Sequence, residues 1–417
     1  METPRNRAEL LREVRKMRFE EAYGGWQARR LTQEQAGELL GMSERNFRRY
    51  VLRYEAEGLD GLIDRRIEQV SKLRAAVDEV IGVVDLYQGK HDGWNVAHFY
   101  QWYKRQRQEK KEMVRSYTWV KNRLQEASVV PRAKARGKHR RKRERRPLPG
   151  MLLHQDGSRH EWVPAVWWDL IVTLDDATGE HTSMFFVEEE GTLSSLHGIG
   201  QTIAAKGLFC SLYTDRGSHY FYTPEANGKV DKARLTQVGR AVAQLGIEHI
   251  AAYSPQARGR SERAFETHQG RLPQELALAG ITDRAAANHY LAAVYMPRHN
   301  AEFMVAASQP GTAYVPFIGT ALPDILCEQY ERTVGQDNCV SFETLKLQIP
   351  ADQIRHHYVK TKVRVHRYVD GTLALFHGPR RLDRYDEEGR SLTNVVTARQ
   401  TVSNIISATA QEWKQAA

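Results

Sequence analysis

The sequence predicts a multidomain protein: all-α modules at the N-terminus, a mixed α/β domain in the centre and a small β-barrel near the C-terminus. Three observations carry this prediction. The 417 residues, of which 41% are hydrophobic, suffice for two to four packed domains. Hydrophobic residues follow a helical spacing up to about residue 124 and strand-like patterns from residue 151. A dense run of basic residues between two prolines separates the two regions.

Positive charge is concentrated in the N-terminal part. Residues 1–150 hold 35 Lys and Arg against 21 Asp and Glu, a net charge of +14, whereas the rest holds 26 against 30, a net charge of −4. This asymmetry favours a module that binds a polyanion, joined to a near-neutral one. The three cysteines fit no metal-binding spacing and indicate a reducing compartment. No apolar run is long enough for a membrane span, so we expect a soluble, cytoplasmic protein that has no membrane partner.

The first module, residues 1–66, is predicted to be a helix-turn-helix. One helix is expected over residues 6–24, and a second follows Thr32, an N-cap with Gln35 three residues on, and ends at Gly41. Ser43 is expected to cap a third helix from Glu44 to about residue 55, with Phe47, Val51 and Tyr54 facing inward. A short turn before a cationic helix is typical of DNA-binding modules. The residues expected to contact DNA are Glu44, Arg45, Arg48, Arg49 and Arg53.

Residues 67–130 predict a second helical module, with helices over 73–88, 95–105 and 116–124. The last is capped by Ser116, and the residues expected to face DNA are Tyr117, Thr118, Lys121 and Asn122. A purely structural spacer remains the alternative. A linker, 131–149, follows, with ten Lys or Arg in the fifteen residues from Arg132 to Arg146. Such a segment cannot build a core but can neutralise phosphates. Its predicted contacts are Arg136, Lys138, Arg140, Arg141, Lys142 and Arg143.

The central domain, residues 150–300, is predicted to follow the order βββαβαβα. Strands are expected over 151–155, 165–174 and 181–187, with a turn at 175–179, and then over 208–213 and 247–252. Helices are expected over 194–206 and 235–245 and from about Gly259 onward. Residues 301–390 then predict a connector and a small β-barrel that includes a hairpin around Val369-Asp370-Gly371. Residues 391–417 show no core pattern and are expected to form a flexible tail.

Three acidic residues, each in its own motif, point to metal chemistry. Asp156 lies in His-Gln-Asp-Gly-Ser, Asp215 in Tyr-Thr-Asp-Arg-Gly-Ser, and Glu262 in Gly-Arg-Ser-Glu-Arg. We expect the first at the end of the first strand, the second at the end of the fourth strand, and Glu262 near the start of the last helix. If the first and fourth strands are neighbours, the three carboxylates meet at one edge of the sheet. Carboxylate oxygens with room for water suit octahedral Mg²⁺, and paired ions cut and join phosphodiesters.

These motifs resemble the Asp-Asp-Glu core of the RNase H-like transposase and retroviral-integrase superfamily. The Thr-Asp-x-Gly-Ser element around Asp215 and the run Tyr-Ser-Pro-Gln-Ala-Arg-Gly-Arg-Ser-Glu-Arg that ends at Arg263 carry most of the resemblance. With the leading helix-turn-helix, the His299-Asn300-Ala301-Glu302-Phe303 segment and the late hairpin, the chain resembles a bacterial insertion-sequence transposase. One departure is the 47-residue separation of the last two acids, which is longer than in retroviral integrases. An inserted loop over 219–234 is expected to absorb the difference.

The resemblance implies that Asp156, Asp215 and Glu262 are catalytic and bind two Mg²⁺ ions, for which Mn²⁺ can substitute. The implied function is a DNA transposase that binds terminal inverted repeats, nicks the 3′ ends and transfers them into target DNA. The implied partners are double-stranded DNA, as transposon ends and target, and further copies of the chain, at least a dimer on paired ends. The implied location is the bacterial cytosol. Arginines near Glu262 are expected to contact phosphate: Arg258, Arg260 and Arg263.

Several alternatives remain open. Glu266 lies one helical turn from Glu262 and is the rival ligand. Asp175 and Asp176 fit a hairpin turn better than the site, and His154 and His219 are poor Mg²⁺ ligands because this ion favours oxygen. Gly217 and Gly259 are expected to provide backbone freedom beside the site. At the level of function, the alternatives are an RNase H-like nuclease or resolvase that cuts without joining, and a repressor derived from a transposase.

Overall fold

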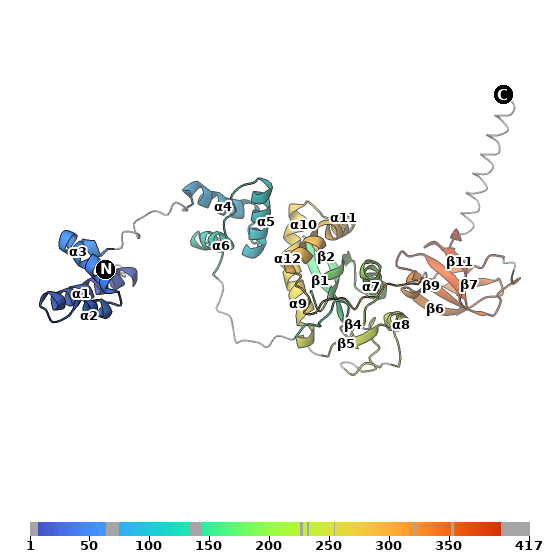
Figure 1. The fold of residues 1–417 in the computed structure, drawn as a ribbon. Coiled ribbons are helices and arrows are strands. Elements are labelled where there is room, and N and C mark those ends of the chain that lie inside the picture. Colours follow the sequence, from blue (N-terminus) through green and yellow to red (C-terminus); the bar gives the residue numbers. More distant parts are fainter. Residues whose placement is uncertain are drawn as a thin grey trace, which may run out of the picture. The chain divides into compact units, whose positions relative to one another are not determined.

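The computed structural model describes residues 7–63, 75–132, 144–225, 228–231, 233–253, 255–319, 322–351 and 354–392. The chain divides into two compact units, residues 1–83 and 84–417. Figure 1 shows the order of the elements along the chain. Each unit is described by itself below.

The N-terminal unit contains the predicted three helices: α1 (Arg7–Gln27), α2 (Gln33–Leu39) and α3 (Glu44–Glu57), followed by the 3₁₀ turn η1 (Gly58–Leu62). The predicted capping box is confirmed, since Thr32 Oγ1 accepts from Gln35 N at 3.2 Å and Gln35 Oε1 accepts from Thr32 N at 2.9 Å. Ser43 stands at the N-cap of α3 but makes no side-chain capping hydrogen bond. Helix α1 continues three residues beyond its predicted end. The core consists of Phe19, Ala22, Ala36, Phe47 and Val51.

Three further helices follow: α4 (Val77–Lys90), α5 (Val96–Glu109) and α6 (Tyr117–Glu126). As predicted, Ser116 caps α6, because its hydroxyl accepts from the Trp119 backbone N–H at 3.2 Å. Val120 and Leu124 are fully buried on α6, as expected. The Trp119 side chain is only half-buried, and the guanidinium of Arg115 lies over its ring.

The central domain is built on a five-stranded mixed sheet with the order β3-β2-β1-β4-β5. The predicted order βββαβαβα is confirmed. Strands β1 and β2 pair antiparallel, as do β2 and β3, whereas β1 pairs parallel with β4, and β4 with β5. The first and fourth strands are therefore neighbours, which is the condition that the convergence of the two aspartates requires. The elements are β1 (Leu153–Val163), β2 (Val166–Asp175), β3 (His181–Val187), α7 (Thr192–Lys206), β4 (Ser211–Thr214), α8 (Gln237–Gln244), β5 (Glu248–Ala251) and α9 (Pro255–Gln269).

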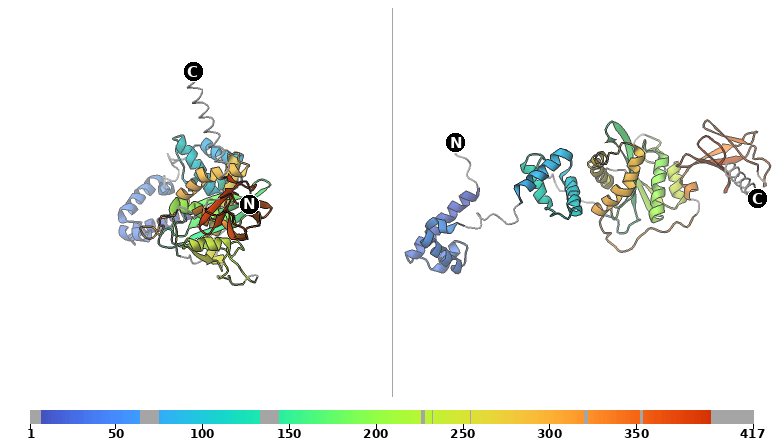
Figure 2. Two further views of the ribbon diagram at one scale, coloured as in Figure 1. Left: turned by 90° about the vertical axis from the view of Figure 1, so that its right-hand side faces the viewer. Right: turned by 90° about the horizontal axis from the view of Figure 1, so that it is seen from above.

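Helices cover both faces of this sheet (Figure 2). Each face has its own hydrophobic core. One core joins Leu153 and Leu212 to α7 and α8. The other joins Leu170, Val172 and Leu174 of β2 to α9 and the helices that follow it. These are α10 (Leu272–Leu278), α11 (Arg284–Tyr290), the π-helical segment η3 (Leu291–Tyr295) and α12 (Met296–Phe303). Between β4 and α8 the described residues form turns and no helix or strand, as expected for the inserted loop.

The C-terminal part is an open β-structure, so the predicted closed barrel is not found among the described residues. Four strands form an antiparallel sheet in the order β11-β10-β9-β6, and β7 and β8 form a separate hairpin. One hydrophobic core joins the sheet to the hairpin, which leaves β6 and β11 as edges. The predicted hairpin around Gly371 is confirmed by the β9–β10 pairing. The elements are α13 (Leu322–Ile325), β6 (Glu328–Thr333), β7 (Cys339–Phe342), β8 (Leu345–Gln348), β9 (Lys362–Arg367), β10 (Leu373–His377) and β11 (Arg380–Tyr385).

Candidate active site

Asp156 lies inside β1 and not at its end, which corrects the sequence prediction. Strand β1 continues to Val163 because it pairs with β2 along its whole length, with Asp156 opposite Val172. The pairing with β4, however, stops at His154 opposite Tyr213. Asp156 therefore lies just beyond the point where β1 and β4 separate. Its side chain is 7% exposed, and its Oδ1 accepts from the Gly157 N–H at 3.1 Å.

Asp215 directly follows β4, as predicted. Its Oδ1 accepts from the Gly217 N–H at 2.9 Å. Tyr213 is the partner of His154, and side chains alternate between the faces of a strand. Asp156 and Asp215, each two residues further on, therefore belong to the same face at the same level of the sheet. That face is the one that carries Leu170, Val172 and Leu174 and is covered by α9.

Glu262 lies in the middle of α9, because the helix begins at Pro255 and not near Gly259 as predicted. Two side-chain contacts fix α9 along β1. Arg260 Nη1 donates to the backbone oxygen of Asp176 at 2.7 Å, next to the start of β1, and Gln269 Nε2 donates to Ser158 Oγ at 2.9 Å. On α9, Glu262 lies between Arg260 and Gln269. On β1, Asp156 lies between the start of the strand and Ser158.

The face of α9 that carries Glu262 also carries Glu266 and Gln269, at helical spacings of four and seven residues. Gln269 contacts Ser158, which shares a strand face with Asp156. Both glutamates are exposed. The fold thus brings Glu262 to the face of the two aspartates, and Glu266 with it.

The three carboxylates are not gathered into a ligand set by the structure. Among the described residues, one group of three His, Cys, Asp or Glu side chains has ligand atoms within 4.8 Å of one another, and it consists of histidines only. The carboxylate oxygens of Asp156, Asp215 and Glu262 therefore do not all lie within 4.8 Å of one another.

A fourth carboxylate, Glu190, lies against the β1 backbone next to Asp156, on the face of the strand opposite to the Asp156 side chain, and was missed by the sequence reasoning. A Cβ on Gly157 would come 2.2 Å from Glu190 Oε2, so this carboxylate lies directly against the backbone next to Asp156. Glu190 Oε1 also lies 3.5 Å from His219 Nε2 and accepts from the Tyr220 hydroxyl at 3.4 Å. The signal in the sequence was the acidic run 188–190, placed immediately after β3.

The electrostatic potential around Tyr220 is negative. Burial raises the pKa of its phenol, and the charges of Glu190, Asp156 and Asp215 raise it further. All three carboxylates are therefore close enough to act on one hydroxyl. A divalent cation would relieve this concentration of negative charge, so the residues present fit a hard metal ion with oxygen ligands.

Asp175 and Asp176 are structural, as predicted for the hairpin turn. Asp175 accepts from the backbone N–H groups of Ala177 and Thr178 at 2.9 and 3.0 Å. Asp176 is fully buried and accepts from His154 Nε2 at 2.9 Å and from the Arg146 backbone N–H at 2.8 Å.

Arg260 pairs with the Asp176 carboxylate and is 14% exposed, so the structure gives it a structural partner in place of the predicted phosphate contact. Burial alone would raise the pKa of Asp176. The hydrogen bonds from His154 and the Arg146 N–H and the charge of Arg260 outweigh burial, however, and hold the pKa well below its usual range. The pair therefore connects α9 to the turn between β2 and β3.

The remaining predicted contacts are placed as follows. The four arginines of α3 are exposed, and Arg48 Nη2 lies 3.0 Å from Glu44 Oε1. On α6, Tyr117, Thr118 and Asn122 are exposed and Lys121 is half-buried. Arg263 is exposed on α9, and its Nε donates to the Gly259 oxygen at 3.0 Å. The Arg258 side chain and the linker residues Arg136, Lys138, Arg140, Arg141, Lys142 and Arg143 lie outside the described part of the chain.

The two glycines act differently from the prediction. Neither Gly217 nor Gly259 has a positive φ. At Gly217 a Cβ would come 3.0 Å from both Asp215 Oδ1 and the His219 ring, so glycine provides space rather than backbone freedom. Gly259 lies within α9, where a Cβ would meet nothing within 4 Å.

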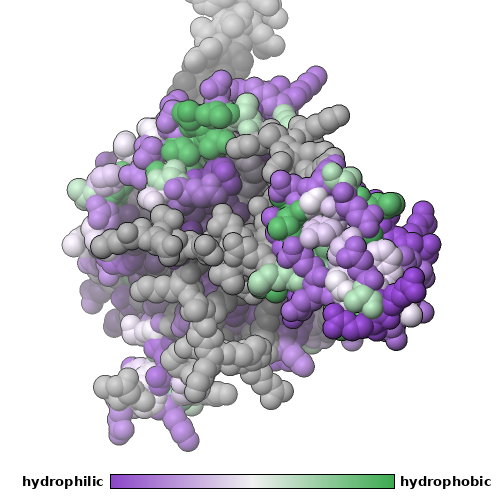
Figure 3. Space-filling view, turned by 90° about the vertical axis from the view of Figure 1, so that its left-hand side faces the viewer, coloured by the Kyte–Doolittle hydropathy of each residue, from purple (hydrophilic) through white to green (hydrophobic). Residues whose placement is uncertain are grey.

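Within the described residues, no helix combines the length and apolar composition that a membrane span requires. Hydrophilic residues cover most of the face drawn in Figure 3, and hydrophobic residues there gather in a few small groups.

Comparison with known proteins supports two parts of this description. A family model for winged helix-turn-helix domains matches residues 22–77, which include α2 and α3. The chain is 29% identical over 238 residues to "Putative transposase y4bF" of Sinorhizobium fredii, covering 55% of this chain and 51% of that protein. It is also 29% identical over 239 residues to "Transposase for insertion sequence IS1202" of Streptococcus pneumoniae, covering 56% and 50%. The chain thus matches about half the length of these curated relatives.

Solved structures with a detectable likeness include a simian T-cell lymphotropic virus intasome, with 14% identity, a TM-score of 0.33, and coverage of 62% of this chain and 84% of that chain. Another is the HTLV-2 integrase catalytic core domain in complex with magnesium, with 17% identity, a TM-score of 0.27, and coverage of 34% and 82%. TM-scores this low do not establish a shared fold. The fold follows from the strand order of the sheet itself. Over about half of their length, the chain is thus similar to transposases, and its N-terminal unit matches a helix-turn-helix family model.

Proposed function

We propose that the protein is a transposase that binds the terminal inverted repeats of an insertion sequence, nicks the 3′ ends and transfers them to target DNA. One observation carries the catalytic part: Asp156 of β1 and Asp215, which directly follows the neighbouring parallel strand β4, lie on the sheet face that is covered by the helix carrying Glu262. The curated relatives support the same class of reaction.

The proposed ligands for two divalent ions are Asp156, Asp215 and Glu262. When bound, such ions activate the attacking hydroxyl and stabilise the leaving oxygen in phosphodiester transfer. The chain orients two of its ligands through the backbone, because the Gly157 and Gly217 N–H groups hold one oxygen of each aspartate. Glu262 is exposed on α9, so its long side chain can turn toward the aspartates when ions and DNA bind.

DNA recognition is assigned to the helices ahead of the sheet. Helix α3 presents four arginines to solvent and matches the helix-turn-helix family model. Arginines on an exposed helix can read base edges in the major groove and neutralise phosphates. Two ends must be handled together in transposition, so we expect at least a dimer on paired DNA ends.

A strand-transfer assay tests the proposal. Full-length protein is incubated with Mg²⁺, a plasmid target and DNA from the ends that flank this reading frame, either intact or nicked in advance at the 3′ end. We expect nicking of intact ends and joining of nicked ends to the plasmid. Cutting without joining would instead indicate a nuclease, and binding without cutting in Mg²⁺ or Mn²⁺ would indicate a repressor.

Glu190 is expected to contribute to catalysis through the aspartates. Glu190→Gln removes a charge that lies against Gly157, so we expect strand transfer to fall about 10- to 100-fold, as with other groups that support metal ligands. Higher Mg²⁺ should restore part of the rate.

The matched control is Glu188→Gln, since Glu188 belongs to the same acidic run but is 86% exposed and lies 3.7 Å from Arg284. The rate of Glu188→Gln should equal that of the wild type. Equal rates for both variants across a Mg²⁺ titration would remove Glu190 from the site.

The exposed arginines of α3 are expected to supply salt-dependent affinity for the element's ends. Replacing Arg48 and Arg49 with Ala should weaken end binding and reduce the slope of log K against log salt by about 0.9 for each phosphate that the variant no longer neutralises. Fluorescence anisotropy at several salt concentrations measures both effects. Arg390→Ala is the control for loss of charge alone, because Arg390 lies in the C-terminal part and its side chain is 76% exposed. If the slope is unchanged when Arg48 and Arg49 are replaced, residues outside α3 must bind the element's ends.

A further inference from the structure

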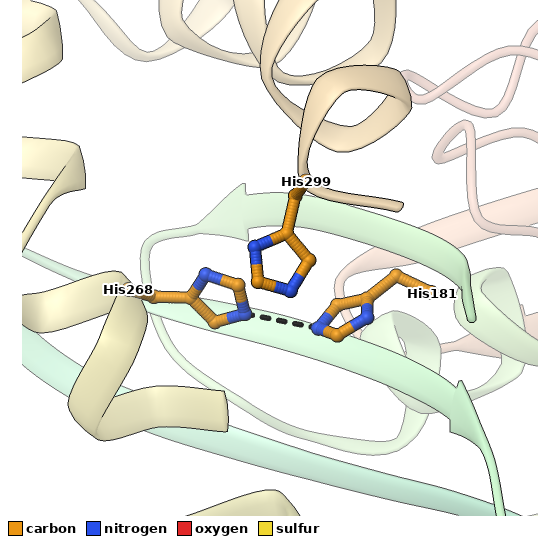
Figure 4. A group of neighbouring side chains, drawn as sticks. All are labelled: His181, His268 and His299. Atoms are coloured by element: carbon orange, nitrogen blue, oxygen red, sulfur yellow. Dashed lines mark hydrogen bonds between the residues drawn. The ribbon is translucent and has the colours of Figure 1, made fainter. Parts of the chain in front are cut away.

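Three buried histidines, one of them on α9, meet in the central domain (Figure 4). His181 is the first residue of β3, His268 lies near the end of α9, and His299 lies in α12. Their exposed fractions are 3%, 0% and 7%. One nitrogen from each ring lies within 4.8 Å of the other two, and no other such group occurs in the part of the chain that the structure describes.

Hydrogen bonds orient two of the rings. His181 Nδ1 lies 3.1 Å from the Gly179 carbonyl, so Nδ1 carries a proton and Nε2 presents a lone pair to the cluster. His181 Nε2 lies 3.0 Å from His268 Nε2, the contact dashed in Figure 4. On its other side, His268 Nδ1 lies 3.0 Å from the Tyr295 hydroxyl.

Without an ion these contacts form a relay. Tyr295 O–H donates to His268 Nδ1, His268 Nε2–H donates to His181 Nε2, and His181 Nδ1–H donates to Gly179. The relay leaves out His299. That ring lies 4.4 Å from His181 and 4.7 Å from His268 between ring centroids, but it makes no hydrogen bond to any described residue. The relay therefore does not explain why a third histidine is here.

We propose that His181, His268 and His299 bind one Zn²⁺ ion, distinct from the ions proposed for the carboxylates. A bound ion would give each of the three rings a partner. Nitrogen-only ligand sets suit Zn²⁺ and not Mg²⁺, which prefers oxygen. A fourth ligand would come from solvent, as in other sites with three histidines.

The geometry requires only a small adjustment. Zn–N bonds of about 2.0–2.1 Å in a tetrahedral site place ligand nitrogens roughly 3.3–3.4 Å apart. The Nε2 atoms of His181 and His268 are 3.0 Å apart, so these rings would separate by a few tenths of an ångström. The proton on His268 would move to Nδ1, which can donate to the Tyr295 oxygen. The Nδ1–H groups of His181 and His268, which face away from the ion, would then each donate to an oxygen, as in most metal-bound histidines.

Neighbouring groups hold the third ring in position. Asn300, next to His299, accepts from the His181 backbone N–H at 2.8 Å and donates to the His181 carbonyl at 2.9 Å, which joins α12 to β3. Tyr295 ends the π-helical segment η3 and stacks on the His299 ring. Burial lowers the pKa of all three imidazoles, so they are uncharged near neutral pH.

The ion would connect three elements that are distant in the sequence: β3, the helix that carries Glu262, and α12. It would stabilise the position of α9 without taking part in phosphodiester chemistry. The inference does not depend on the proposed function, because a metal site of this kind can be present in a nuclease or a repressor with the same fold.

Metal analysis of the intact protein tests the inference. Untagged full-length protein, purified without chelators and dialysed against Mg²⁺, is expected to hold about one equivalent of zinc. Replacing zinc with Co²⁺ should give the intense visible absorption of a tetrahedral nitrogen site. His299→Phe, which keeps an aromatic ring in place, should lower the zinc content about tenfold or more, because two imidazoles make a weak site.

Two controls separate this site from others. His366→Phe removes a buried histidine of the C-terminal sheet whose two ring nitrogens have no partner, and it should keep the zinc. Asp156→Asn removes a proposed Mg²⁺ ligand and should keep it as well. Wild-type protein with less than about a tenth of an equivalent of zinc, and no cobalt absorption, would overturn the inference in favour of the relay, whether or not the variants fold.

Discussion

Asp156→Asn is expected to abolish Mg²⁺-dependent nicking and strand transfer while leaving binding to the element's ends intact. The same holds for Asp215→Asn and Glu262→Gln. Each change keeps the shape of the side chain but removes the charge that holds a divalent ion. Metal ions contribute several kcal/mol to transition-state stabilisation in phosphodiester transfer, so we expect a loss of about 10³-fold or more in rate. Strand transfer on pre-nicked ends measures the loss, and electrophoretic mobility shifts on the same DNA measure binding.

Glu266→Gln is the decisive control for the third ligand. Glu266 is exposed on the same face of α9 as Glu262, so it has similar access to the aspartates. We expect this variant to retain strand transfer. Activity in Glu262→Gln together with loss in Glu266→Gln would assign the third ligand to Glu266. Normal strand transfer by any of the three primary variants would remove that residue from the catalytic set.

Asp176→Ala is expected to destabilise the central domain by about 3–5 kcal/mol, the usual effect of removing one member of a buried ion pair. Asp176 is fully buried and has three partners: His154, the Arg146 backbone and Arg260. Its loss leaves the guanidinium of Arg260 without its carboxylate, while the hydrogen bond from Arg260 to the backbone oxygen of residue 176 remains. Urea unfolding followed by tryptophan fluorescence measures the change.

The contribution of Asp176 should depend on pH in a defined direction. Its pKa is lower in the folded protein than the ordinary value of 3.8, so the folded state favours the charged form. The stabilisation is therefore complete above about pH 5 and is lost as the pH falls toward the folded-state pKa. The difference between wild type and Asp176→Ala should shrink in acid.

Glu331→Ala is the comparison for Asp176→Ala, because its ion pair with Lys362 is 61% and 73% exposed. We expect a change below about 1 kcal/mol. An equally small effect for Asp176→Ala would show that the buried network contributes little to stability.

Much of the central domain follows from local sequence patterns. The strand β3 was predicted with its observed bounds, because a run of apolar and β-branched residues follows the turn made by Asp175 and Asp176. The order of elements, βββαβαβα, was also predicted correctly, whereas the adjacency of β1 and β4 was only assumed. Asp156 and Asp215 share a face because of the register between β1 and β4. The pattern of a single strand does not encode that register.

The errors have physical reasons. Residues Ser158, Arg159 and His160 are polar, so β1 was expected to end at Gln155; pairing with β2 nevertheless continues, since the outward positions of a long strand tolerate polar side chains. Helix α9 was expected to begin near Gly259, but Pro255 suits the first turn of a helix. The C-terminal strands were expected to close because their alternation resembles that of barrel strands, and alternation alone does not distinguish a closed barrel from a sheet packed on a hairpin.

Contacts between distant residues were beyond the reach of the sequence. The acidic run 188–190 did not indicate that the Glu190 carboxylate would lie against Gly157, and nothing around Arg260 indicated that its side chain would pair with Asp176. The three buried histidines come from segments separated by 87 and 31 residues, so no local spacing marks them as a group.

The two aspartates are attached to the sheet in different ways. Asp156 is held inside β1 by the ladder to β2, whereas Asp215 stands where β4 ends and the chain leaves the sheet. Insertions or deletions between β4 and α8 can therefore change the chain after Asp215 without moving the backbone of Asp156. Relatives of this protein can thus vary widely in the length of that segment and still keep the same pair of acids, so the spacing of the acids is a poor guide to kinship.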